Sequence, residues 1–99
     1  LDLTGAAVDD VGAQQLRGLP RLQALSLRSS RVTDRGLPAV GSLGGLLSLN
    51  LAATRITDRG LPALVRLQRL QVLNLSKTGA TPRGIALLQR ALPRTQIVP

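Results

Sequence analysis

Two consecutive stretches of the sequence share one pattern: LSLRSSRVTDRGLPAVGSLGGLLS at residues 25–48 and LNLAATRITDRGLPALVRLQRLQV at residues 49–72. Cutting the chain at Leu1, Leu25, Leu49 and Leu73 brings four such segments of 24 residues into register without a gap. Self-similarity at a fixed period is the signature of stacked repeats. The sequence therefore predicts a single repeat domain over 1–99, with repeats at 1–24, 25–48, 49–72 and 73–96 and a terminal strand at 97–99.

Each repeat changes its hydrophobic period halfway along. Leu25 and Leu27 alternate with period two, which predicts a short strand with one buried face. Leu61, Leu64 and Leu67 recur every third residue, which predicts a helical segment. A strand, a turn and a helix cannot bury their apolar faces alone, so the repeats are expected to stack.

Stacking predicts an α/β solenoid with a short parallel sheet on one face and helices on the other. Parallel strands joined by such crossovers almost always form a right-handed coil. Strands pack about 4.8 Å apart and helices roughly 8–10 Å apart, so the stack should curve. We therefore expect the sheet on the concave face and the helices on the convex face.

The turn between strand and helix carries capping residues. Thr33 and Thr57 stand where a helix N-cap belongs, and Thr81-Pro82 places a cap before a proline at the first helical position. Asp34 and Asp58 follow the threonines, and we expect exposed carboxylates that only favour the helix N-terminus. A glycine column should permit close packing between neighbouring repeats; it comprises Gly12, Gly36, Gly60 and Gly84.

The L-x-x-L-x-L pattern followed by V/I-T-D-R-G-L resembles a leucine-rich repeat of the ribonuclease-inhibitor-like superfamily, over essentially the whole chain. The turn is similar to those of F-box substrate receptors and many bacterial repeat proteins. Those F-box repeats often carry Cys or Asn where this chain has Ala6, Ser30, Thr54 and Thr78. The hydroxyls should still bond adjacent backbone carbonyls. The resemblance implies a protein-interaction scaffold that binds through its concave face.

The predicted concave face is small, polar and nearly uncharged. The candidate partner-binding residues on it are Ser26, Arg28, Asn50, Asn74 and Ser76. The face lacks the aromatic anchors that usually carry interface energy, because the chain contains no Phe, Trp or Tyr. A solvated sheet face with no partner therefore stays open as an alternative.

The chain carries a net charge of +8, which favours acidic partners, nucleic acid or anionic lipid. By repeat the charge runs −1, +2, +3 and +4 along the chain. Arg31 and Arg55 are candidate basic contacts, and an Arg-rich C-terminal half could bind a polyanion. The missing aromatic side chains argue against single-stranded nucleic acid. A protein partner is the main hypothesis; a polyanion-binding module and a structural spacer remain alternatives.

The sequence predicts no enzyme, no metal and no cofactor. It contains no Cys and no His, so zinc sites, thiol nucleophiles and imidazole bases are excluded. The sequence contains no run of about 18 apolar residues, the length that a membrane-spanning helix needs. Leu1 opens directly on a strand position, so we expect further leucine-rich repeats N-terminal to it. Leu92-Pro93 should end the last helix, and Ile97-Val98-Pro99 should form a closing strand.

Overall fold

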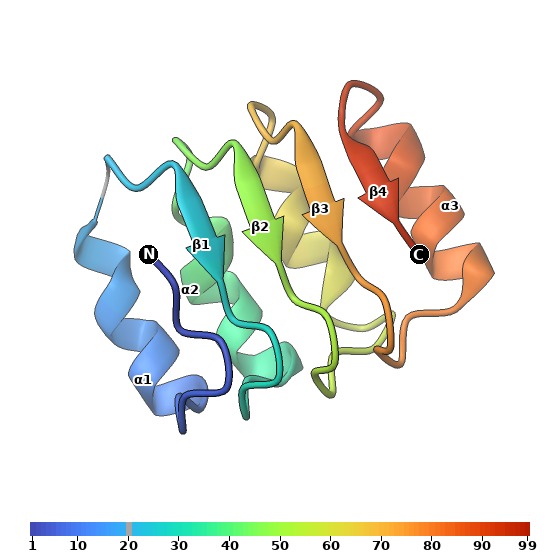
Figure 1. Ribbon diagram of the computed structural model, residues 1–99. Helices are drawn as coiled ribbons and strands as arrows, with labels where there is room; N and C mark the ends of the chain where they lie inside the picture. The colour runs from blue at the N-terminus through green and yellow to red at the C-terminus, as the bar shows by residue number, and fades with distance from the viewer. Residues whose placement is uncertain (20) are drawn as a thin grey trace.

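A computed structural model describes residues 1–19 and 21–99 as a stack of four coils, each made of one strand position, one turn and one helical segment (Figure 1). The strands are β1 (Ala24–Ser26), β2 (Ser48–Asn50), β3 (Val72–Asn74) and β4 (Gln96–Val98). The α-helices are α1 (Asp10–Gln14), α2 (Leu37–Gly41) and α3 (Pro82–Ala91). The 3₁₀-helices are η1 (Gln15–Gly18), η2 (Asp34–Gly36) and η3 (Leu61–Arg66).

The four strands form one parallel sheet in the order β1-β2-β3-β4. Leu25 pairs with Leu49, Leu49 with Leu73 and Leu73 with Ile97, so each step across the sheet advances the chain by 24 residues. The first coil adds only an isolated bridge between Asp2 and Ser26. The strands run the same way along the front of Figure 1 and the chain returns behind them, which makes the coil right-handed.

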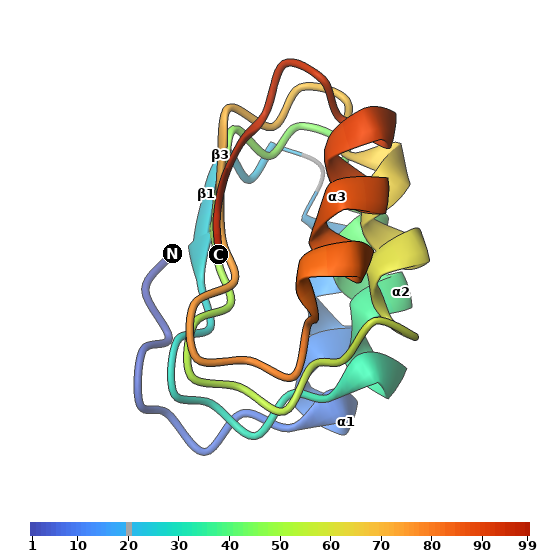
Figure 2. The ribbon, with the colours of Figure 1, turned by 90° about the vertical axis from the view of Figure 1, so that its right-hand side faces the viewer.

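The core lies between two layers, with the sheet on one side and all helical segments on the other (Figure 2). The sheet layer supplies the middle residue of β1, β2 and β3 and a buried leucine just beyond each strand, such as Leu49 and Leu51. The helical layer supplies residues such as Leu37 and Leu64. The predicted α/β leucine-rich-repeat solenoid, with the sheet on the concave side and the helices on the convex side, is confirmed.

The helical segments differ in type from coil to coil. Leu61, Leu64, Leu67 and Leu70 are all buried, and the segment over Leu61–Arg66 is a 3₁₀-helix. A 3₁₀-helix has three residues per turn, so leucines spaced by three stack on one side of it. The fourth repeat instead forms the ten-residue α3. Its N-cap is Thr81, whose hydroxyl accepts from the Gly84 N–H at 3.2 Å, as predicted.

Aspartates in the turns join neighbouring coils, which corrects the expectation that they are merely exposed helix-start charges. The Asp34 carboxylate accepts from the backbone N–H of Thr57 at 2.8 Å and from its hydroxyl at 2.5 Å. Asp58 accepts from Thr81 in the same way, at 2.8 and 2.5 Å. Asp10 accepts from Thr33 with 2.7 and 2.5 Å. We call these three pairs the Asp–Thr ladder.

The glycine column makes room for this ladder. A Cβ on Gly36 would lie 2.7 Å from the nearer carboxylate oxygen of Asp10. Gly60 and Gly84 face Asp34 and Asp58 in the same way, at still closer range. The expectation of close packing is confirmed at these three positions, whereas Gly12 faces Val8 of its own coil.

In the fourth coil α3 ends at Ala91 with Leu92 as its C-cap, and β4 pairs with β3 over residues 96–98, one residue earlier than the expected strand at 97–99. Among the described residues, none of the helices is long and apolar enough to cross a membrane.

Candidate functional site

The exposed side of the sheet presents its side chains in rows that run across the strands. Ser26, Asn50 and Asn74 are paired in register on β1, β2 and β3, and Val98 continues the row on β4. These side chains are half-buried, while the leucines between them point into the core. The structure thus brings three of the candidate partner-binding residues into one row. We call this surface the sheet face.

The two asparagines of the row have a fixed orientation. The Asn50 side-chain oxygen accepts from the Ala52 N–H at 3.0 Å. The Asn74 oxygen accepts from the Ser76 N–H at 2.9 Å and from the Ser76 hydroxyl at 2.8 Å. Within residues 1–19 and 21–99, no group accepts a hydrogen bond from either amide nitrogen. Both amide nitrogens are therefore available as donors on neighbouring strands.

These asparagine contacts hold a turn with unusual backbone angles. Ser29, Ala53 and Lys77 have φ of 58°, 57° and 57°, and Gly5 holds the same place in the first coil at 70°. Non-glycine residues avoid this left-handed region because Cβ crowds the following carbonyl, at a cost of about 1 kcal/mol each. The strained residue recurs at the same repeat position after β1, β2 and β3, where the chain turns towards the helices.

The remaining candidate residues divide between two surfaces. Arg28 is exposed just past β1, and Ser76 lies just past β3, where its hydroxyl donates to Asn74. Arg31 and Arg55 are exposed in the turns that lead from strand to helix, so they lie on the edge of the solenoid and not in the sheet-face row. Ala52, which the alternation also places on the concave face, is only 3% exposed.

The hydroxyls of Thr54 and Thr78 bond within their own coil. Thr54 donates to the Leu51 carbonyl at 2.6 Å, and Thr78 donates to the Leu75 carbonyl at 2.7 Å. Ser30 differs, because its hydroxyl oxygen accepts from the Val32 N–H at 3.4 Å. The expected bonds to nearby carbonyls are thus present at both threonines.

Two carboxylates have perturbed acidity, and hydrogen bonding is the cause in each. The side chain and backbone of Thr81 hold the pKa of Asp58 below its ordinary value. Thr4 lowers the pKa of Asp2 in the same manner. In the described part of the chain, no group of three or more His, Cys, Asp or Glu gathers as a metal site would require. Both carboxylates act as hydrogen-bond acceptors, Asp58 towards the next coil and Asp2 within its own coil.

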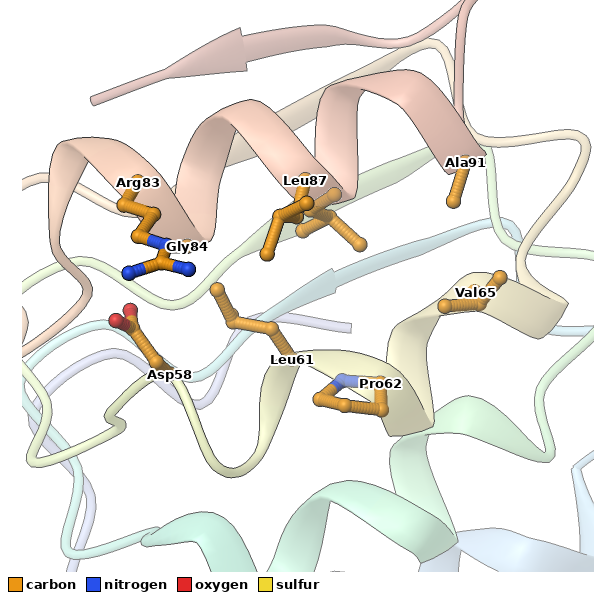
Figure 3. Close-up of a pocket in the computed structure, with 9 residues that line it drawn as sticks. Asp58, Leu61, Pro62, Val65, Arg83, Gly84, Leu87 and Ala91 are labelled. Atoms are coloured by element: carbon orange, nitrogen blue, oxygen red, sulfur yellow. The ribbon is translucent and has the colours of Figure 1, made fainter.

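A groove of about 510 Å³ on the helical side was not anticipated from the sequence (Figure 3). Leu61 and Val65 of η3 form one wall, and Leu87 of α3 forms the other. Asp58 and Arg83 lie at one end. Leu87 remains 58% exposed. The sequence contained one indication of this groove: Leu87 stands at a repeat position where the two preceding repeats carry alanine.

Comparison with known proteins identifies the fold. No family model matches the chain, and no curated protein matches it. A solved leucine-rich-repeat protein of Leptospira interrogans superposes with a TM-score of 0.59 and 21% sequence identity over 85% of this chain. The chain spans only 27% of the length of that protein.

The chain is therefore an α/β repeat protein with the leucine-rich-repeat fold.

Proposed function

We propose that this domain is a non-enzymatic scaffold that binds a protein partner through its sheet face. The observation that carries the proposal is the orientation of Asn50 and Asn74. Their oxygens are held by backbone N–H groups at 3.0 and 2.9 Å, which leaves both amide nitrogens free to donate. Adjacent strands lie about 4.8 Å apart, so the two donors form a closely spaced pair.

The chemistry of this surface defines the partner group. Carbonyl or carboxylate oxygens of a protein would accept from the asparagine amides. Ser26 already shares a hydrogen bond with Thr4 at 2.6 Å, so the free capacity of the row is concentrated at the two asparagines. The contact is polar, which supports a hydrogen-bonded interface and not one centred on a buried aromatic anchor.

The test uses a substitution that keeps the fold and removes only the donors. Asn50→Asp combined with Asn74→Asp retains an oxygen for each backbone N–H and replaces each amide nitrogen by an acceptor. The matched control, Gln14→Glu with Gln15→Glu, makes the same amide-to-carboxylate change at exposed helical positions. Both variants lose the same amount of positive charge.

Immobilised wild type, the sheet-face variant and the control variant would be incubated with a lysate of the source organism. We expect wild type and the control variant to retain the same proteins from the lysate, and the sheet-face variant to lose at least one of them. Equal retention by all three would contradict binding through the sheet face.

We also propose that the repeats belong to the V/I-T-D-x-G-L subtype seen in F-box-type and bacterial leucine-rich-repeat proteins. Each letter of this motif has a physical role in the third repeat. Ile56 is buried, Thr57 donates to Asp34, and Asp58 accepts from Thr81. Gly60 leaves space for the Asp34 carboxylate. The Thr57→Val variant, which keeps the shape and removes the hydroxyl donor, should lower the melting temperature measurably; an unchanged value would argue against this assignment.

A further inference from the structure

The positive charge is separated between the two edges of the solenoid. We define the helix-to-strand edge as residues 15–19, 21–23, 41–47, 65–71 and 89–95, which lies at the top of Figure 1. This edge contains no Asp or Glu, and its six basic side chains are Arg17, Arg21, Arg66, Arg69, Arg90 and Arg94. The other seven basic residues share the rest of the chain with all five aspartates. Three-quarters of the net charge is thus on one edge.

Helix termini account for only part of this arrangement. Arg17, Arg66 and Arg90 lie in the last turns of η1, η3 and α3, where a cation offsets the partial negative charge of the helix end. Arg69 and Arg94 lie beyond the helices, in the loops that precede β3 and β4. All six arginines of the edge are exposed, so their guanidinium groups are accessible to a partner.

Two depressions place arginines beside apolar surface. One has a volume of about 410 Å³ and lies along the outer side of α2, where Arg17 and Arg66 share it with Pro38 and Pro62. Its position follows from the second repeat, whose GSLGG segment at 41–45 has no long polar side chain. The other, of about 300 Å³, lies at the C-terminal end of the edge and combines Arg94 with the exposed side chains of Pro93 and Gln68.

We propose that the helix-to-strand edge docks an acidic protein segment whose carboxylates alternate with apolar side chains. Guanidinium groups bind carboxylates through paired hydrogen bonds. The proline surfaces in the depressions would contact the apolar side chains, for which a nucleic-acid backbone has no counterpart. The chain also has no aromatic side chain on which a base could stack. This surface is separate from the sheet face, so the two proposals stand or fall independently.

The experiment compares two variants that remove the same charge from opposite edges. The edge variant replaces four arginines by glutamine: Arg66, Arg69, Arg90 and Arg94. The control variant replaces four exposed arginines near the strand-to-helix turns: Arg31, Arg35, Arg55 and Arg59. The probe is a fluorescein-labelled peptide of repeated Asp-Asp-Leu units, and its dissociation constant is measured by fluorescence anisotropy at 0.05 and 0.15 M salt.

We expect the edge variant to bind the peptide at least about tenfold more weakly than wild type and the control variant less than about threefold more weakly, because local charge pairs act within a Debye length of about 10 Å. Equal weakening would show that net charge alone attracts the peptide and would overturn the proposal. Absence of wild-type binding at the lower salt would overturn it as well.

Two competing partners are tested with the same variants. A short DNA duplex and vesicles containing phosphatidylserine replace the peptide. Tighter binding of either one, with the same dependence on the edge arginines, would assign the surface to phosphate groups and refute the protein segment.

Circular dichroism shows whether the edge variant folds. If it does not fold, the double variant Arg69→Gln with Arg94→Gln avoids the helix termini and should still weaken peptide binding at least about threefold, against no change for Arg31→Gln with Arg55→Gln. Equal effects of these two pairs would again overturn the proposal. The sheet-face variant Asn50→Asp with Asn74→Asp should weaken peptide binding less than about threefold, because both positions lie outside the edge.

Discussion

Gly41 occupies the closest approach between two neighbouring coils, and its substitution by alanine tests the stacking geometry directly. A Cβ at this position would lie 3.1 Å from the Ala63 carbonyl carbon and nearer still to the Ala63 carbonyl oxygen. Non-bonded carbon atoms settle about 3.5–4.0 Å apart, so the carbon contact alone would separate α2 and η3 by about 0.5–1 Å, and the closer oxygen contact requires more. The obstructing atoms belong to backbone, so no side-chain rotation can relieve the contact.

Overpacking of this kind costs about 1–3 kcal/mol. Alanine regains about 0.4–1 kcal/mol by restricting the unfolded chain, so we expect Gly41→Ala to lower the free energy of unfolding by about 1–2 kcal/mol. In a domain of this size the melting temperature should fall by about 4–16 °C. Urea unfolding followed by circular dichroism measures the first quantity, and a thermal scan measures the second.

Gly44→Ala is the matched control, because a Cβ on Gly44 would meet nothing within 4 Å. It should leave stability unchanged or raise it by up to about 1 kcal/mol. If Gly41→Ala behaved like Gly44→Ala, with a difference below about 0.5 kcal/mol, the second and third coils could not be packed as the structure has them.

Other predictions follow from the core, the Asp–Thr ladder and the strained turns. Leu51 is fully buried, so Leu51→Ala should cost about 2–5 kcal/mol in urea unfolding; a loss below about 0.5 kcal/mol would mean that the residue is not in the core. The pKa of Asp58 is lowered by Thr81, so its stabilising effect is complete above the unfolded pKa of about 3.9 and is lost as pH falls through the lower folded value. Asp58→Asn should therefore flatten the decline of melting temperature below about pH 4; an unchanged decline would contradict a role for this carboxylate. Ala53 has φ of 57°, so Ala53→Gly should relieve about 1 kcal/mol of strain and raise stability by up to about 0.5 kcal/mol after the entropy of glycine is subtracted. The control Ala24→Gly, in the regular strand β1, should instead destabilise by about 0.5–1 kcal/mol, and the same sign for both would refute the strain argument.

The sequence was sufficient to predict the fold because its leucines are positional. The change of hydrophobic period from two to three within a repeat predicted which residues form the sheet layer and which form the helical layer. Leu49 and Leu64 are buried as that pattern requires. The cap at Thr81 could be predicted because capping depends on residues close together in the chain.

Contacts between coils were harder to predict. Asp34 and Thr57 are 23 residues apart, and beside Thr33 the aspartate looks like a local capping residue. The arginine edge was missed although Arg66 and Arg90 share a repeat position, because segments without Asp or Glu form one continuous edge only when the coils stack. For the sheet face, sequence alternation indicated which side chains are exposed but not that Asn50 turns its oxygen inward.

The Asp–Thr ladder also makes the array extensible. The third repeat, 49–72, carries both a donor and an acceptor of the ladder. Thr57 donates to Asp34 of the preceding repeat, and Asp58 accepts from Thr81 of the following repeat. A second copy of this segment inserted after Val72 would find a matching acceptor behind it and a matching donor ahead, with Gly60 again clearing the space. The third repeat is in this sense a self-compatible building block, and the domain could be lengthened one turn at a time without designing a new interface.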